Sequence, residues 1–235
     1  MRTLIFILFL FPVFLQGQVF TSYSAVSGVE CPVVGNPCGG VTAVSYGGES
    51  YATVAIGTQC WLQRNLNIGA KVSGATNQTN NGTIEKYCYD DDDANCVIYG
   101  GMYQWDEAMQ YVTTESAQGI CPSGWHIPTV TEFNTLVNCL GGTAGAGGKL
   151  KEIGTTHWAT PNTGATNSSG FTGLPGGWRS SAPAFANINN FGFFFTSTEV
   201  NATYVKYFWF SYNGQNTSTE NYFKSAGFSI RCLKN

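Results

Sequence analysis

The chain has 235 residues, of which 43% are hydrophobic, 14% aromatic and only 11% charged, and its formal net charge is −3. Because no cluster of lysine and arginine is present to neutralise phosphates, nucleic acid is a poor candidate partner and we expect none. The 29 glycines and the many aromatic residues instead predict a loop-rich fold with a core of large, flat side chains.

The N-terminus has the pattern of an export signal. Arg2 carries the one early charge, Leu4 to Leu15 forms an apolar run, and Gly17 closes it. The run is too short for a membrane anchor, which needs roughly 20 apolar residues. We therefore expect residues 1–17 to be a signal peptide, the mature protein to be secreted or held at the cell surface, and no membrane span to remain after cleavage.

Residues 18–47 are rich in Gly, Ser, Val and Pro and poor in charge, which predicts an N-terminal extension. Cys31 and Cys38 flank a turn-prone stretch within it, so a local disulfide between them is expected. Tyr51 to Ile56 is a partly alternating, β-branched run and is typical of a first strand. We accordingly place one domain over residues 48–235.

The eight cysteines of an exported chain predict four disulfides. Cys88 and Cys96 flank an Asp-rich loop and are a second candidate for a local bridge. Spacing leaves the pairing of the others open, and these are Cys60, Cys121, Cys139 and Cys232. Structural zinc is not expected, because the sequence contains no CxxC pair.

Two helices are predicted in the middle of the chain. Apolar residues recur at helical spacing from Tyr103 to about Thr113, which favours a first amphipathic helix. The second begins at a capping box formed by Thr129 and Glu132. Its apolar face and its glycine stop follow at Phe133, Leu136, Val137, Leu140, Gly141 and Gly142.

Strands are predicted for the later apolar runs, which are Gly170 to Leu174, Phe191 to Ser197, Tyr204 to Tyr212 and Phe228 to Leu233. Helices followed by strands indicate the α+β class. The run YVKYFWFSY has aromatic residues at both odd and even positions, so both faces of a strand would be aromatic. It is either a strand covered on both faces or one with an exposed aromatic surface. Ordinary burial preferences favour the covered strand.

Several stretches together resemble the FISUMP family, the Fibrobacter succinogenes major paralogous domain of exported bacterial proteins. They occur in the family's order over about residues 46 to 235. The matching pieces are YATVAIGTQCWLQRNL, YCYDDDDANCVIYGGMYQWDEAM, CPSGWHIPTVTEFNTLVNCLGG, GGKLKE, GFTGLPGGWR, FFFTSTE and GFSIRCL.

The resemblance implies a C-type-lectin-like fold with two helices and short antiparallel strands, in which the first and last strands pair. It suggests disulfides between Cys121 and Cys232 and between Cys88 and Cys96. Cys60 and Cys139 stand where the family pattern lacks cysteine, so a bridge between them is the simplest hypothesis.

No catalytic residues are expected. The segment HIPTVTEFNTLVNCL also resembles sulfatase-modifying, formylglycine-generating proteins, whose fold is related. Those enzymes use a pair of reactive cysteines near the C-terminal part of the domain, where this chain has only Cys232. The imaginable acids or bases are His126, Glu132 and Glu199, but no nucleophile accompanies them in a motif, which favours structural roles.

A calcium site is a weak candidate at four consecutive carboxylates, Asp90, Asp91, Asp92 and Asp93. Adjacent side chains point in different directions, and the spacing of a dedicated calcium loop is absent, so a solvated acidic loop is favoured. The chain also lacks the EPN, QPD and WND triplets of calcium-dependent sugar-binding lectins. No other cofactor is expected.

The candidate ligand-binding surface lies near the C-terminus, where aromatic residues mix with amides. Such residues give contact area at low entropic cost together with adaptable hydrogen bonds. Similar segments are the diversified binding region in the variable proteins of diversity-generating retroelements, whose scaffold this domain resembles. The candidate residues are Tyr204, Tyr207, Trp209, Tyr212, Asn213, Asn216 and Tyr222.

The leading functional hypothesis is an exported, non-catalytic binding or adhesion module that recognises a glycan or a cell-surface protein. The alternative is a structural subunit of an extracellular fibre or surface appendage, in which residues 18–47 add a strand to another copy of the chain.

Overall fold

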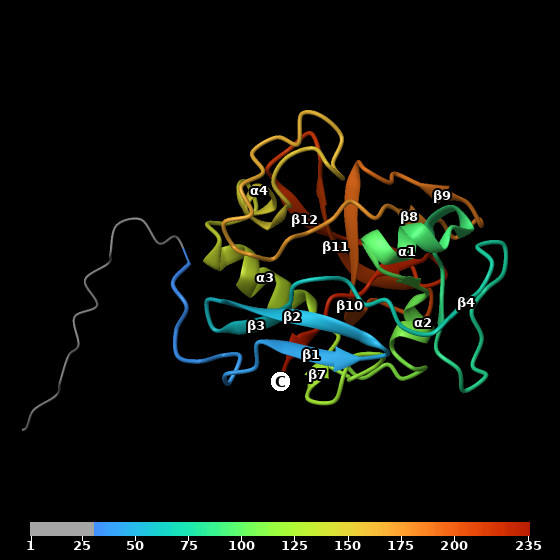
Figure 1. The fold of residues 1–235 in the computed structure, drawn as a ribbon. Helices are drawn as coiled ribbons and strands as arrows, with labels where there is room; N and C mark the ends of the chain where they lie inside the picture. The colour runs from blue at the N-terminus through green and yellow to red at the C-terminus, as the bar shows by residue number, and fades with distance from the viewer. Residues whose placement is uncertain (1–30) are drawn as a thin grey trace, which may run out of the picture.

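The structure is a computed structural model that describes residues 31–235, so the expected signal peptide and residues 18–30 lie outside the described residues. Two five-stranded sheets form the framework (Figure 1). The first has the order β1 (Ala43–Tyr46), β2 (Glu49–Ile56), β3 (Gln59–Leu62), β14 (Leu233–Lys234) and β7 (Trp125–His126). The second has the order β12 (Thr217–Phe223), β11 (Tyr204–Ser211), β10 (Phe191–Glu199), β13 (Phe228–Ser229) and β6 (Met102–Tyr103).

Two further strand pairs lie outside these sheets. One joins β4 (Ala70–Lys71) to β5 (Glu85–Lys86) in parallel, and the other joins β8 (Trp178–Arg179) to β9 (Phe185–Ala186) antiparallel.

The first strand of the sheet comes from the segment assigned to the extension. β1 pairs antiparallel with β2, with Tyr46 opposite Glu49. Gly47 and Gly48 connect them, and both have positive φ, as a two-residue hairpin turn requires. The strand predicted as the first is therefore the second of the sheet.

The C-terminal run joins the two sheets. It was predicted as one strand, but β13 pairs in the second sheet and β14 pairs with β3 and β7 in the first. The break falls at Arg231, whose buried guanidinium donates to the carbonyl oxygens of Leu62 and Phe171 at 3.0 and 2.6 Å. These bonds hold Arg231 between the end of β3 and the core segment that contains Phe171, at the point where the chain leaves one sheet for the other.

Four α-helices occur in the described residues, where two were expected. They are α1 (Asp93–Tyr99), α2 (Trp105–Ala108), α3 (Val130–Cys139) and α4 (Ala146–Leu150), and a 3-10 turn, η1 (Tyr89–Asp91), precedes α1. The prediction for α3 is confirmed, with both bonds of the capping box between Thr129 and Glu132 in place. None of the helices within residues 31–235 has the length and apolarity needed to cross a membrane.

The first predicted helix is much shorter than expected. α2 ends early because Gln110 and Tyr111 adopt φ values of 51° and 59°, which no right-handed helix accommodates. α1 was not predicted; it begins where the Asp92 carboxylate accepts the N–H of Ala94.

The main aromatic core lies between α3 and the two sheets. Phe133 of α3 stacks on Phe208 at a centroid distance of 4.5 Å and lies 5.1 Å from Trp61 of β3. Phe171 packs edge-on against Trp61, although its segment, predicted as a strand, makes only an isolated bridge between Lys151 and Gly173. That segment is apolar because it fills the core, not because it belongs to a sheet.

Two of the four expected disulfides are confirmed, namely Cys88–Cys96 and Cys121–Cys232. The other two predictions, Cys31–Cys38 and Cys60–Cys139, are wrong, because these cysteines exchange partners to give Cys31–Cys139 and Cys38–Cys60.

The exchange follows from the path of the N-terminal segment. Its Val34 N–H donates to the carbonyl of Gly57 in the turn between β2 and β3. A Cβ at Gly57 would lie 2.7 Å from the sulfur of Cys139 and 3.3 Å from that of Cys31, so this turn runs directly beside the bridge. The segment is thus fixed to α3 and β3 and does not close a loop of its own.

Lys151, which follows α4, is fully buried and orders the loops around the exit of β11. Its ammonium donates to the carbonyl oxygens of Thr163, Ser211 and Gly214 at 2.8–2.9 Å. Burial lowers the pKa of Lys151 to about 8. The carbonyl dipoles take the place of a carboxylate partner for this cation.

Candidate functional site

The outward face of the second sheet carries a row of aromatic side chains, which we call the outer aromatic face. Buried Tyr207 is a member, and the others are partly exposed. Successive rings lie 4.8–6.1 Å apart between centroids. The members are Trp178, Phe191, Phe193, Tyr207, Trp209 and Tyr222.

Strand register places these rings on one side. Phe193 of β10 lies opposite Trp209 of β11, and Val205 lies opposite Tyr222 of β12. Directly opposed residues point to the same face of a sheet, and alternate residues of a strand share a face. Phe193 packs against Trp178 and stacks on buried Phe228 of β13, whereas Trp209 stays partly exposed.

One exposed carboxylate organises the open part of this face. Glu220 of β12 accepts the Tyr207 hydroxyl at 3.1 Å and the Trp209 indole N–H at 3.2 Å. Burial, followed by the charge of Glu220, raises the pKa of Tyr207, so its hydroxyl remains a donor at neutral pH. The geometry thus combines fixed aromatic surface with an acceptor group at its edge.

The structure divides the candidate residues predicted from the sequence. Tyr207, Trp209 and Tyr222 share the outer aromatic face. Tyr204 lies on the opposite side of β11, where its ring packs against Phe223 at 4.7 Å.

The other three candidates also lie away from the face. Tyr212 packs against the inner core. Asn213 accepts a hydrogen bond from the Ser211 hydroxyl. Asn216 belongs to a turn whose carbonyl lies close to Gly147 of α4. Tyr212 therefore contributes to core packing, and Asn213 and Asn216 belong to the loop between β11 and β12.

Sequence reasoning missed Trp178, Phe191, Phe193 and Glu220. The signal was the period-2 alternation of FGFFFT at residues 191–196, in which the odd positions share one face. Glu220 lies inside the candidate stretch but was passed over because only aromatic and amide residues were chosen.

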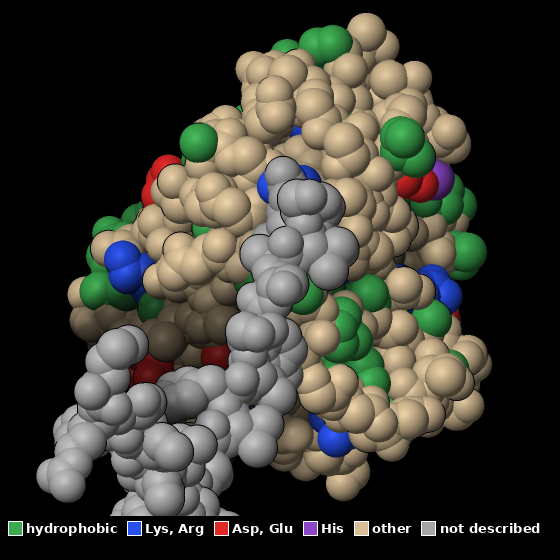
Figure 2. Space-filling view, turned by 90° about the vertical axis from the view of Figure 1, so that its left-hand side faces the viewer, with side chains coloured by type: hydrophobic (Ala, Val, Ile, Leu, Met, Phe, Trp, Pro, Cys, Tyr) green, Lys and Arg blue, Asp and Glu red, His purple; other side chains and the backbone are tan. Residues whose placement is uncertain are grey.

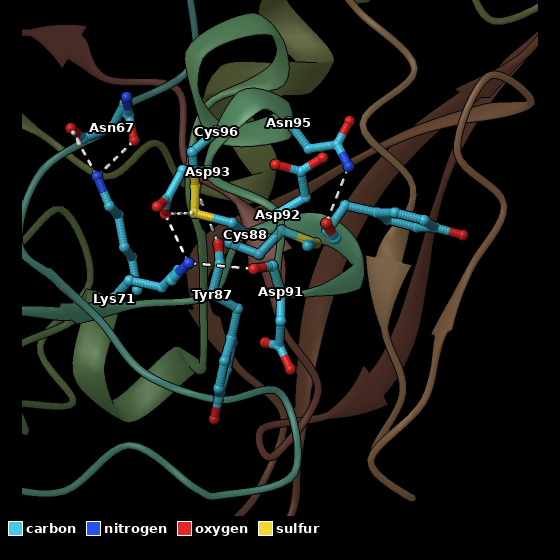
Figure 3. The surroundings of a disulfide bond; sticks show 12 residues. Asn67, Lys71, Tyr87, Cys88, Asp91, Asp92, Asp93, Asn95 and Cys96 are labelled. Atoms are coloured by element: carbon cyan, nitrogen blue, oxygen red, sulfur yellow. Dashed lines mark hydrogen bonds and ion pairs between the residues drawn. A yellow bond between two sulfur atoms is a disulfide. The ribbon is translucent and has the colours of Figure 1, made fainter.

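Three carboxylates of the acidic loop are engaged by protein groups. Lys71 binds the Asp93 carboxylate at 2.7 Å, Asp91 accepts the Gly74 N–H at 2.7 Å, and Asp92 caps α1. Figure 3 shows these carboxylates pointing apart around the Cys88–Cys96 bridge, with the Lys71 ammonium also reaching the Asp91 carbonyl. Within residues 31–235 no group of three or more His, Cys, Asp or Glu residues is arranged to hold a metal ion.

His126 and Glu132 form a pair that anchors α3. Nε2 of His126 lies 3.0 Å from a Glu132 oxygen, and Nδ1 lies 2.7 Å from the side-chain oxygen of Asn235. Burial acts to lower the pKa of His126, but the hydrogen bonds to Glu132 and Asn235 outweigh it and raise the pKa. Burial likewise acts to raise the pKa of Glu132, and the bonds from His126 and Thr129 lower it overall.

The third imagined acid or base, Glu199, binds the Lys224 ammonium at 2.6 Å. In the described chain His126 contacts Glu132 and Asn235, and Glu132 also accepts the backbone N–H of Thr129. These hydrogen bonds and ion pairs tie the three side chains to neighbouring elements.

Charged residues make up only 11% of the chain. Figure 2 shows a face on which single blue and red groups lie among polar and backbone atoms, with no broad patch of either sign. A face with so few charged groups exerts little electrostatic steering on a partner.

Fold and site together define a disulfide-linked α+β domain whose second sheet has a partly exposed aromatic face. The family model of the Fibrobacter succinogenes major domain matches residues 54–234, so the chain belongs to this family. No curated protein and no solved structure matches it.

Proposed function

We propose that this chain is an exported, non-catalytic binding module of C-type-lectin-like architecture whose outer aromatic face binds a glycan. The expected pairing of the first and last strands is not seen, because β14 pairs with β3 and β7 and not with β1 or β2. Support for the architecture comes from the Cys121–Cys232 bridge and from the place of β14 in the N-terminal sheet, and four disulfides suit an oxidising compartment outside the cell.

The observation that carries the proposal is the partly exposed Trp209 ring, held by its N–H bond to exposed Glu220. A rigid indole offers its face to the C–H groups of a sugar at little entropic cost. The carboxylate beside it accepts hydroxyl hydrogen bonds, which are stronger for a charged acceptor. A glycan matches this combination better than a flat protein surface does, because both groups serve one small ligand.

The test is a glycan array probed with the mature, oxidised protein and two variants. Trp209→Ala removes the ring from the outer aromatic face. Tyr204→Ala removes an exposed aromatic ring from the same strand on the opposite side, and is the matched control. We expect a saturable signal that Trp209→Ala abolishes and Tyr204→Ala retains. Equal loss in both variants, or a signal for host-surface proteins alone, contradicts the glycan proposal.

A structural subunit is the second candidate, and the sheet edges favour it. β12 and β1 end the two sheets, and an edge strand presents backbone groups to a further strand. Residues 31–46, however, are bound to their own domain by Cys31–Cys139, Cys38–Cys60 and β1, which leaves residues 18–30 for exchange. Filaments of purified protein that disappear when residues 18–30 are deleted are the result this candidate predicts.

A further inference from the structure

A polar hollow of about 350 Å³ lies where α2 meets the ends of β11 and β12. Its lining differs from the members of the outer aromatic face. The residues that matter for its chemistry are Gln104, Asp106, Glu107, Tyr111, Thr203 and Lys224.

The floor of this hollow consists of buried polar groups whose positions are fixed. Glu107 is 1% exposed, and its two carboxylate oxygens accept the Glu85 N–H at 2.9 Å and the Tyr111 hydroxyl at 2.7 Å. Gln104 is 7% exposed and donates to the carbonyl of Ser225 at 2.7 Å. A ligand therefore meets a preorganised polar surface, which lowers the cost of binding.

The rim is exposed and carries the unusual backbone of the α2 exit. Tyr111 is 37% exposed and has a φ of 59°, and the preceding Gln110 has a φ of 51°. Left-handed backbone at successive non-glycine residues is costly and concentrates at ligand-binding segments. Here it turns the chain back so that the Tyr111 hydroxyl reaches the floor and its ring stands at the rim.

Charge inside the hollow selects against anions. The Lys224 ammonium binds Glu199 at 2.6 Å and lies 3.8 Å from Asp106 and 4.2 Å from the centre of the Trp105 ring. Glu199 already neutralises this cation, so the Asp106 carboxylate, 53% exposed, remains an acceptor at the rim. An anionic ligand would meet the carboxylates of both Asp106 and Glu107.

We propose that this hollow is a second ligand site that binds a neutral hexopyranose. Each hydroxyl of such a sugar both donates and accepts, and the walls offer an acceptor at Asp106, a hydroxyl at Thr203 and an exposed amide at Asn77. Pockets for small ligands span roughly 300–1,000 Å³, and this hollow is at the lower end, which suits a single ring. The inference goes beyond the proposed function, because the site is independent of Trp209.

The experiment titrates the full oxidised protein with the methyl glycosides of glucose, galactose and mannose, observed by saturation-transfer NMR. We expect at least one glycoside to bind saturably in the millimolar range. Asp106→Asn should weaken it by about tenfold, because a charged acceptor is replaced by a neutral one. The substitution is isosteric at an exposed position, so the fold is retained.

Two controls keep this result separate from the proposed function. Asp90→Asn changes an exposed carboxylate of the acidic loop and should leave glycoside affinity unchanged. Trp209→Ala should also leave it unchanged, even where it abolishes the array signal. Absence of saturable binding by all three glycosides, or unaltered affinity in Asp106→Asn, overturns the proposal. Stronger, competitive binding of ethanolamine would assign the hollow to a cation instead.

Discussion

Phe208 and Trp209 are neighbours in β11, yet they belong to opposite faces of the second sheet with different surroundings. Phe208 is 1% exposed and lies under α3, together with Phe194 and Phe210 on what we call the inner face. Trp209 is partly exposed and has Glu220 and Phe191 beside it. Both faces are aromatic, but only the inner face is covered by another layer. An aromatic face therefore stabilises the fold where a layer covers it, and its side chains remain available for binding where none does.

The largest expected effect is on the inner face. Phe208→Ala should lower the free energy of unfolding by about 3–5 kcal/mol, because it removes a stacked ring from a closed core and leaves a cavity. Phe191→Ala, on the outer aromatic face, should cost only about 1 kcal/mol. Urea unfolding with the disulfides intact measures both. Similar costs for the two variants would show that the faces are equally covered in solution.

The next effect concerns Lys151, which holds the end of the inner face. Lys151→Met keeps the side-chain volume but leaves buried carbonyls of Thr163, Ser211 and Gly214 without their donor. We expect a loss of about 2–3 kcal/mol. The control is Lys71→Met, which removes an exposed ion pair with Asp93 and should change stability by less than about 1 kcal/mol. Equal, small losses would mean that water replaces the ammonium.

A pH-dependent effect is expected from the pair that anchors α3 over the inner face. The raised pKa of His126 contributes stability that is complete below its ordinary value of 6.5 and is lost as the pH rises through the raised value. The lowered pKa of Glu132 contributes stability that is present above 4.5 and is lost as the pH falls through the lowered value.

Glu132→Gln should therefore cost most between about pH 4.5 and 6.5, by about 1.5 kcal/mol, with smaller losses on either side. Unfolding free energies of wild type and variant at intervals from pH 3 to 8, about one unit apart, provide the measurement. If the difference in unfolding free energy between wild type and variant does not vary with pH, Glu132 stabilises the protein only by capping α3.

The smallest stability effect is expected for Trp209→Ala, at about 1 kcal/mol or less, because its ring is only partly covered. The same change is expected to abolish glycan binding. A loss of glycan binding with little loss of stability would distinguish the outer aromatic face most clearly from the inner face. If Trp209→Ala lowers the free energy of unfolding as much as Phe208→Ala does, Trp209 is part of the core and the proposed binding face is wrong.

Local sequence signals predicted the elements that local physics controls. α3 was predicted correctly because its capping box, Thr129 and Glu132, and its apolar face lie within about a dozen consecutive residues. β10 and β11 were found as apolar runs, and the Cys88–Cys96 bridge closes over only eight positions. β12 was missed because its polar residues resemble a loop, and it forms only by pairing with β11.

The sequence by itself determined the family, the α+β class, the capped helix α3 and the aromatic character of the second sheet, since each depends on residue types at short spacing. Tertiary structure alone decided the partners of Cys31 and Cys60, the division of the C-terminal run at Arg231, and the separation of Tyr204 from Trp209. Those outcomes depend on which distant segments pack together. The free energy of that packing depends on both segments at once, so no single stretch of sequence determines it.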